Sequence, residues 1–580
     1  MTKNRLTPFS TLALSAFLFA GCAYNPDYDK AFVSYSSGDI SAAHTELSLE
    51  STDENIANSS EPLRWALGLG VLSGLCGDYP VSEKHLVRAE EKISADLRLN
   101  GEEGFLEAAK SLVSGDYEVR VQEALMVPVF RIYNSLGMRD TQGAFATAKA
   151  AENLSSAVLE LNGKGVSARW DELRAEQSFE LEPGKSGVYN PADEAKNDDE
   201  LLAQVRALYG KGVPAAGAAA NAAELDSMLL DAYGEDFTID FERGFAESVY
   251  VNPFAYWLCA AVRMNAAEER KDLEDAAALL REAVKATGKN IGFLNDELLL
   301  AENAAACADL SVAKDTVLKD QKDVTYVIYE GGHSPRVVAA PVTVKLPKAV
   351  HFIANAVVIA AGGVGVRTQG TAYFPITDPT NAPAPELEFS GGRLDTIVDY
   401  DDVLEETFRG EAALNAANAV YDLATSVVTR TLAVVTTRVA LEVARKNDKS
   451  GGYVTAAAEA AFTAAVVYAA LPIELDKPDL RTWRLLPRTL EVAKIATPSD
   501  GELRFGEETV RVPAKGVNFV RVRKFDEYWP ATVQVLPLVS SETEPAPVLR
   551  LKGRPVPEAL PAQAPVGEPP SPSALVPAGE

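Results

Sequence analysis

The pattern of hydrophobic positions in the first half of the chain predicts pairs of helices joined by short polar turns. The clearest turn is Gly77-Asp78-Tyr79, with Leu69 and Gly70 on the helix before it and Leu86 on the helix after it. Small and large apolar residues at these spacings allow two helices to approach closely. Similar units centre on residues 38–39, 137–140 and 270–272.

Residues 155–240 lack this regularity, and glycine and proline interrupt them at positions 183–184 and 212–214. We expect irregular helices and a surface loop in this segment. Helical pairs of this kind stack into a curved superhelix with a concave groove. Residues 22–322 are therefore predicted to form a tetratricopeptide-like α-solenoid, irregular over 155–240.

Near residue 323 the apolar pattern changes to short β-like runs. Val324 to Glu330 and Val337 to Leu346 flank a turn rich in glycine and proline, which indicates a strand, a turn and a strand. Two helices are expected, from about Leu404 to Lys446 and from Val454 to Ala470, followed by β-like runs near 489–496, 503–512, 516–524 and 531–538. Residues 323–539 are therefore predicted to be an α+β domain with a small antiparallel sheet and long helices, in a mainly α chain.

Three apolar segments of this second half need an explanation. The predicted long helix carries an apolar stripe at helical spacing, which indicates a buried face: Val420, Leu423, Val427 and Val434. The uncharged run Ala349 to Val366 is long enough to be considered as a membrane span, but it contains His351, Asn355 and three glycines. We interpret it as a buried strand or helix. The Ala-rich helix from Val454 includes Glu459 and is a weaker candidate for a span.

Both ends of the chain differ in composition from the rest. Residues 540–580 are rich in proline, alanine and glutamate, which predicts a disordered tail. At the other end, Lys3 and Arg5 precede an apolar run and small residues that stand just before Cys22. This pattern resembles a bacterial lipobox, so residues 1–21 are predicted to be a signal peptide and Cys22 the lipidated residue; an ordinary cleaved secretory signal is the alternative.

The predicted acyl chains on Cys22 would hold the protein at a bilayer without a transmembrane helix. Ala23, rather than an aspartate, follows the cysteine. By resemblance to lipoprotein sorting in Gram-negative bacteria, this favours the outer membrane and a periplasm-facing position.

Charge excludes one class of partner. The 580 residues include 55 basic and 83 acidic side chains, a net charge of −28, and loss of Lys3 and Arg5 with the signal makes it −30. Nucleic acid is not an expected partner, because phosphate binding requires a basic surface. The apolar share of 47% is ample for a folded core.

The cysteines and histidines suggest no metal site or cofactor. Cys76, Cys259 and Cys307 lie far apart in helical patterns, so we expect buried thiols, with a Cys76–Cys259 or Cys259–Cys307 disulfide as the alternative. The four histidines show no ligand spacing to one another or to cysteine.

The lipobox and the helix pairs, together with Tyr250-Val251-Asn252-Pro253-Phe254, the Tyr326 to Gly331 stretch and the run from Asp479 to Pro487, resemble an uncharacterised family of bacterial tetratricopeptide-like lipoproteins. The resemblance covers most of residues 22–500. It implies an architecture and a location but no chemistry.

Two groups of residues are candidates for a site. Glu330, His333 and Ser334 surround one turn and could support acid–base chemistry, although glycine and proline there are first of all turn-formers. Arg430, Arg438 and Arg445 share one side of the long helix and could bind an anionic glycan, a lipid head group or carboxylates; pairing within the protein, as with Glu442, is the alternative.

No nucleophile elbow, phosphate loop or dinucleotide-binding motif is present in the sequence. The sequence therefore predicts a protein that is not an enzyme: a lipid-anchored periplasmic scaffold that binds an envelope protein through its helical repeats. Glycan or lipid binding by the C-terminal domain is the second hypothesis, and an envelope hydrolase using His333 the third.

Overall fold

The structure is a computed structural model that describes residues 27–59, 61–102, 121–151, 179–180, 188–189, 252–345, 348–378, 382–447, 453–475, 480–527, 530–539 and 544–553. The predicted signal peptide and Cys22 lie outside the described residues. So do nearly all of the irregular segment 155–240 and the end of the predicted tail. Two short strands, β1 (Phe179–Glu180) and β2 (Val188–Tyr189), pair with each other in the irregular segment.

A six-stranded mixed sheet forms the centre of the body, in the order β13-β12-β11-β3-β8-β6. Its strands are β3 (Val324–Gly331), β6 (Asp395–Asp399), β8 (Thr489–Ala496), β11 (Val517–Lys524), β12 (Thr532–Pro537) and β13 (Val548–Arg550). β11 runs parallel to β3, and the other neighbours are antiparallel. The predicted strand positions in this half are confirmed, but the prediction of a small antiparallel sheet is wrong.

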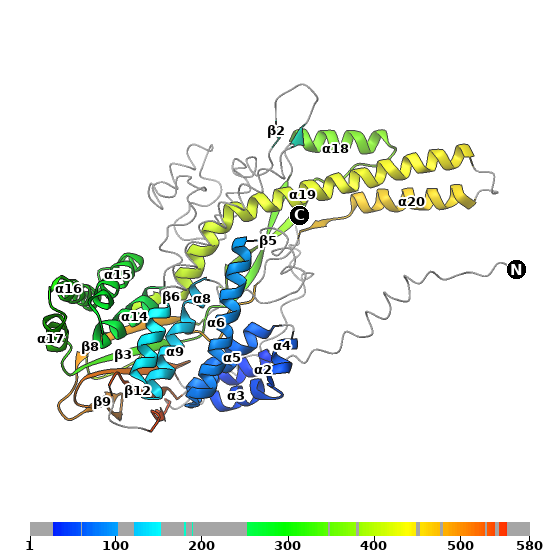
Figure 1. The fold of residues 1–580 in the computed structure, drawn as a ribbon. Helices are drawn as coiled ribbons and strands as arrows, with labels where there is room; N and C mark the ends of the chain where they lie inside the picture. Colours follow the sequence, from blue (N-terminus) through cyan, green and yellow to red (C-terminus); the bar gives the residue numbers. More distant parts are fainter. Residues whose placement is uncertain are drawn as a thin grey trace, which may run out of the picture.

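Helices from the first half of the chain cover one face of this sheet (Figure 1). They are α2 (Tyr28–Ser36), α3 (Ile40–Ser48), α4 (Asp53–Asn58), α5 (Pro62–Cys76), α6 (Tyr79–Glu102), α8 (Val121–Ala124), α9 (Met126–Gly137), α14 (Pro253–Ala266), α15 (Arg270–Thr287), α16 (Gly292–Ala306) and α17 (Leu310–Asp320). Trp257 shows how they attach, since its ring lies 5.3 Å from that of Tyr326 on β3 and 6.4 Å from that of Phe519 on β11.

The predicted solenoid is wrong, although its helical pairs exist. α5 and α6 form the predicted hairpin, in which Gly77 adopts a left-handed φ of 86° and ends α5. In a solenoid each pair would bury its other face against the next pair. Here that face packs on the sheet instead, and one core cluster contains both Leu72 of α5 and Phe519 of β11.

The opposite face of the sheet is covered by a small hairpin of β9 (Glu502–Phe505) and β10 (Glu508–Arg511). Leu503, Phe505 and Val510 of this hairpin pack with Val327 and Tyr329 of β3 in a second core cluster. Alternate residues of β3 therefore enter different cores, which explains why all eight of its residues are buried. The body thus consists of helices, sheet and hairpin.

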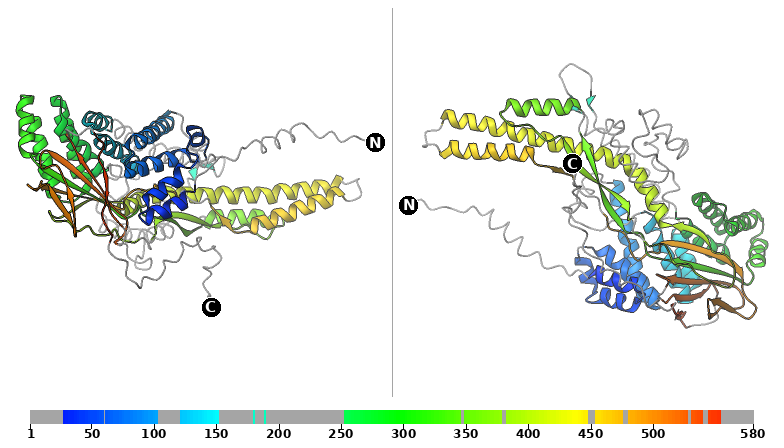
Figure 2. Two further views of the ribbon diagram at one scale, coloured as in Figure 1. Left: turned by 90° about the horizontal axis from the view of Figure 1, so that it is seen from below. Right: turned by 180° about the vertical axis from the view of Figure 1, so that it is seen from behind.

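An arm extends from the body (Figures 1 and 2). It contains α18 (Lys348–Ala360), α19 (Tyr400–Asn447) and α20 (Tyr453–Ala470), and it is connected through a sheet of β4 (Val337–Lys345), β5 (Gln369–Thr377) and β7 (Ile473–Glu474). α19 has 48 residues, which at 1.5 Å per residue makes it about 72 Å long. The predicted ranges of α19 and α20 are confirmed.

Two sequence predictions for chain connections are corrected. β4 pairs with β5 and not with β3, because the turn after Gly331 leads the chain out of the six-stranded sheet into the arm. Part of the predicted disordered tail is ordered, since β13 extends the sheet and Ala546 accepts a hydrogen bond from the Tyr79 hydroxyl at 2.9 Å. A proline-rich composition does not prevent a short edge strand from pairing.

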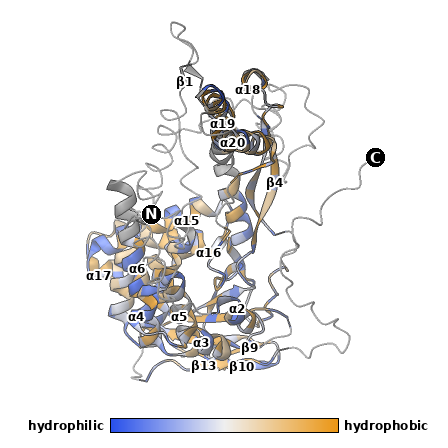
Figure 3. Cartoon of the chain, turned by 90° about the vertical axis from the view of Figure 1, so that its right-hand side faces the viewer, coloured by the Kyte–Doolittle hydropathy of each residue, from blue (hydrophilic) through white to orange (hydrophobic). Residues whose placement is uncertain are grey.

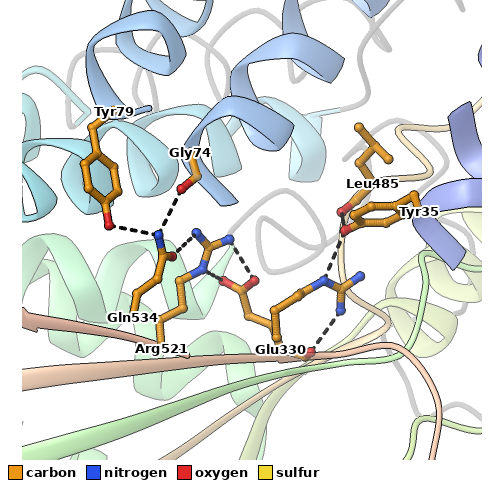
Figure 4. A network of polar contacts seen from close by, with 8 residues as sticks. Tyr35, Gly74, Tyr79, Glu330, Leu485, Arg521 and Gln534 are labelled. Atoms are coloured by element: carbon orange, nitrogen blue, oxygen red, sulfur yellow. Dashed lines mark hydrogen bonds and ion pairs between the residues drawn. The ribbon is translucent and has the colours of Figure 1, made fainter. Parts of the chain in front are cut away.

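A buried polar network ties the helices to the sheet (Figure 4). Arg521 donates to both carboxylate oxygens of Glu330, at 2.8 and 2.9 Å, and to Gln534 at 3.0 Å. Gln534 in turn donates to the Gly74 carbonyl at 2.9 Å, at the end of α5. Arg523 donates to the Tyr35 hydroxyl at 3.1 Å. Side chains of neighbouring strands thereby hold the ends of α2 and α5.

Replacing Glu330 with alanine is predicted to lower the free energy of unfolding by about 3–5 kcal/mol, because it leaves the buried Arg521 guanidinium without its carboxylate. Urea unfolding measures this. The matched control is Glu274→Ala, which breaks an ion pair with Arg270 on the half-exposed surface of α15 and should cost less than about 1 kcal/mol. Equal costs for the two variants would show that the network does not hold the body together.

Candidate functional site

α20 is an apolar helix with little to bury it. It is rich in alanine, the strongest helix former, and Glu459 is the one charged residue among its 18. Within the described part of the chain, it is the one helix found long and apolar enough to cross a membrane, and 11% of it is buried. A core helix of the same composition would be mostly buried.

The other arm helices are also apolar along much of their length (Figure 3), and they too expose large apolar side chains. Large apolar side chains that are at least 41% exposed occur on or next to α18 (Val357, Ile359, Val364), on α19 (Val428, Leu432, Val439, Val443) and on α20 (Tyr453, Val454, Val467, Tyr468). The interpretation of residues 349–366 as a buried element is therefore wrong. These residues form a helix and a turn, and among the side chains described from residue 354 on, Val358 and Val366 are buried in the cluster with α19 while Val357, Ile359 and Val364 are exposed.

The helices of the arm pack together through a narrow apolar seam. Leu423, Val427 and Val434 of α19 are buried, as the stripe predicted, and lie in one cluster with Val358 of α18 and Ala465 of α20. Because alanine and valine are small, the helices can approach closely. These contacts bury one side of each helix. Apolar side chains also remain exposed on the outer sides.

Arg430 holds the end of α20 against α19. Its guanidinium donates to the carbonyl oxygens of Tyr468 at 3.0 Å, Leu471 at 2.5 Å and Pro472 at 3.2 Å, and it lies 4.6 Å from the centre of the Tyr468 ring. Tyr468 lies in the last turn of α20, and Leu471 and Pro472 follow its end at Ala470. Arg430 thus binds carbonyls in and just after the last turn and places a favourable charge at the negative end of the helix dipole.

The other two arginines of the predicted stripe also find partners within the arm. Arg438 pairs with Glu442 at 3.1 Å and lies over the Phe462 ring of α20. Arg445 pairs with Glu459 of α20 at 2.7 Å. The structure therefore brings Arg430, Arg438 and Arg445 together along α20, and their contacts are those of the internal-pairing alternative.

His333 lies far from the arm, in an aromatic site of the body. Its half-buried ring stacks on Phe525 at 5.3 Å and meets the edges of Phe32 and Tyr35. Burial, helped by the charges of Arg523 and Arg484, lowers the pKa of His333 to about 3. The Glu330 carboxylate is bound by Arg521, so the acid of the predicted turn is paired with a guanidinium and not with the imidazole.

The remaining candidates form no site among the described residues. Neither of the alternative disulfides forms, and the prediction of buried thiols holds for Cys259 but is wrong for Cys76, which is exposed, and for Cys307, which is partly exposed. Across the described ranges, no three His, Cys, Asp or Glu side chains gather as possible metal ligands. Trp483 is buried and packs 5.6 Å from Phe130, while Arg481 pairs with Glu61.

No family model, no curated protein and no solved structure matches this chain. The resemblance to tetratricopeptide-like lipoproteins therefore stays a prediction. The candidate site is the arm, because the arm exposes the apolar surface that the fold leaves unexplained.

Replacing Arg430 with methionine is predicted to loosen the end of α20, because three carbonyls lose a charged donor. Charged hydrogen bonds of this kind contribute about 1.5–3 kcal/mol, so chymotrypsin should cleave after Tyr468 or Leu471 about tenfold faster. Arg438→Met is the control and should change cleavage little, since Glu442 is solvent-exposed. Equal cleavage of the parent and the Arg430 variant would contradict the capping role.

The aromatic site around His333 predicts a pH dependence of stability. Because the folded pKa lies below the unfolded value near 6.5, only the unfolded chain gains a proton between pH 6.5 and about 3, so stability falls as the pH drops through this range. From pH 7 to pH 5 this group should cost about 1–2 kcal/mol. Urea unfolding of His333→Phe should show a correspondingly smaller loss, and an identical loss would place the imidazole in water.

Proposed function

We propose that this protein is a non-enzymatic scaffold of the bacterial cell envelope, in which acyl chains on Cys22 hold the body at a membrane and the arm attaches to an apolar surface away from the body. The observation that carries the proposal is the arm itself, which leaves the body and exposes apolar side chains on all three of its helices. The attachment element is thus the arm and not a repeat groove.

Energy favours an occupant for this surface. Large exposed apolar patches on folded proteins mark interaction sites. Covering a half-exposed valine or leucine gains roughly 1 kcal/mol, so the eleven exposed side chains of the arm could together contribute on the order of 10 kcal/mol before the costs of association. An arm left in water would forgo this energy.

The connection between arm and body is a continuous helix whose first residues are anchored in the body. α19 begins at Tyr400, which is buried in the body and whose hydroxyl accepts a hydrogen bond from Asn252 at 3.2 Å. The backbone N–H of Tyr400 donates to the backbone carbonyl of Arg488 at 2.9 Å, and the Arg488 side chain pairs with Asp401. One uninterrupted helix then runs from this anchorage into the arm.

The location follows from the sequence prediction: lipid-anchored at the outer membrane and facing the periplasm. The partner is an envelope component rather than nucleic acid, since the chain carries a net charge of −28. A hydrolase based on His333 is disfavoured. An imidazole with a pKa of about 3, whose neighbouring acid is bound by an arginine, is a poor general base near neutral pH.

In-cell photo-crosslinking tests the proposal. A photo-reactive amino acid at Val443, on the outer side of α19, should give adducts with membrane lipid or with an envelope protein. The matched control is Leu318 of α17, which is equally apolar and exposed but lies on the body. Adducts at position 443 no more frequent than at position 318 would contradict attachment through the arm.

A further inference from the structure

We infer that the surface occupied by the arm is a phospholipid bilayer rich in anionic lipid, into which the arm inserts end-on. The inference rests on the proposed attachment through the arm and names its partner. Four properties of the outer part of the arm, residues 348–367 and 428–471, point to lipid: exposed apolar side chains on three helices, three arginines with partners inside the arm, an excess of basic residues, and tyrosines near both ends of an apolar stretch of membrane dimensions.

The distribution of the exposed side chains favours immersion. Ile359 on α18, Leu432 and Val439 on α19, and Val467 on α20 are exposed on three different helices that pack together in one cluster. A second copy of the chain or a groove of a partner would cover one side of such a bundle. Lipid chains can cover every side at once, and helices that are apolar all round are typical of membrane interiors.

The polar groups within the arm are largely prepared for a medium without water. Arg438 and Arg445 each pair with a glutamate, and Arg430 donates hydrogen bonds to three carbonyl oxygens at the end of α20. In hydrocarbon, unpaired charges and unsatisfied backbone groups are strongly unfavourable. These contacts lower that cost, and the tip of the arm keeps Lys446 for a head-group region.

Charge distinguishes the arm from the rest of the chain. By sequence, residues 348–367 and 428–471 contain seven basic residues (Lys348, Arg367, Arg430, Arg438, Arg445, Lys446, Lys449) and three acidic ones (Glu442, Asp448, Glu459). These two segments, which form the outer part of the arm, therefore carry +4 in a chain of −28. Basic residues beside an apolar segment are attracted to anionic lipid head groups.

The dimensions also fit a bilayer. α20 has 18 residues and is about 27 Å long, close to a hydrocarbon thickness of about 30 Å. Tyr453 begins the helix and Tyr468 lies near its end, both exposed and about 23 Å apart along the axis. Tyrosine prefers the two interfaces of a membrane. We therefore expect these two tyrosines at opposite interfaces and Ala461 between them.

Vesicle flotation tests binding directly, with the chain from residue 22 carrying Cys22→Ala so that no acyl chain contributes. It should float with vesicles of phosphatidylglycerol and phosphatidylethanolamine. The double variant Ala461→Glu/Val467→Glu, on the exposed side of α20, should reduce the bound fraction at least tenfold. Leu318→Glu, an equivalent change on α17, should leave it unchanged. Equal flotation of all three proteins would overturn the inference.

An environment-sensitive dye on single cysteines, with the native cysteines replaced, tests the end-on geometry. A dye at A461C should be quenched by lipids labelled deep in the acyl chain, and dyes at Y453C and Y468C by lipids labelled near the head group. Equal quenching depth at the three positions would overturn end-on insertion.

One outcome separates this inference from the proposed function. If no vesicles are bound, but position 443 crosslinks in cells to a protein or to a second copy, the lipid inference fails and attachment through the arm stands. If position 443 also gives no adducts above those at position 318, the proposed function fails as well.

Discussion

α19 connects the core of the body to an arm with an apolar outer surface. Its first residue, Tyr400, is buried among the helices and the sheet of the body, and its last turn lies at the far end of an arm whose outer surface is apolar. Because each turn of the helix is hydrogen-bonded to the next, the anchored start of α19 leads without a break into the arm. The proposed function depends on what covers the arm.

The helices of the arm contact one another through small residues along one side of each helix, and Arg430 satisfies the end of α20. In the body, by contrast, buried polar side chains connect the helices to the sheet. Glu330 and Arg521 lie under the helices and connect the sheet to α5 through Gln534. Specific buried hydrogen bonds fix the body, whereas the outer sides of the arm carry few polar groups. This contrast supports a rigid base and an arm adapted to a less polar medium.

The local elements could be predicted from the sequence, and their assembly could not. The strand over residues 489–496 and the long helix from about residue 404 have clear periodicities, and the structure has them nearly where expected. The sequence also predicts the helical hairpin at Gly77. The sequence pattern of the hairpin predicts how α5 packs against α6, but it does not predict what covers the other face of the pair. In the structure a sheet covers this face, where a solenoid would have the next repeat. The parallel pairing of β3 with β11 joins residues nearly 200 positions apart and leaves no local signal.

The candidate site shows the same limit. The spacing of Arg430, Arg438 and Arg445 correctly placed them on one side of a helix, and Glu442 suggested internal pairing. The prediction that residues 349–366 are buried is wrong, because an uncharged helix has the same composition in a protein core and in lipid. The lack of a polar outer face on α20 was the signal available. Only the spatial arrangement shows that 11% of the helix is buried by the part of the chain that the structure describes.

Hydrogen–deuterium exchange of the unacylated chain, with and without anionic vesicles, tests the membrane role of the arm most directly. Insertion predicts that backbone amides of α20 exchange much more slowly in the presence of vesicles, while those of α15 on the body are unchanged. Exchange of α20 that is the same with and without vesicles would contradict a membrane-inserted arm.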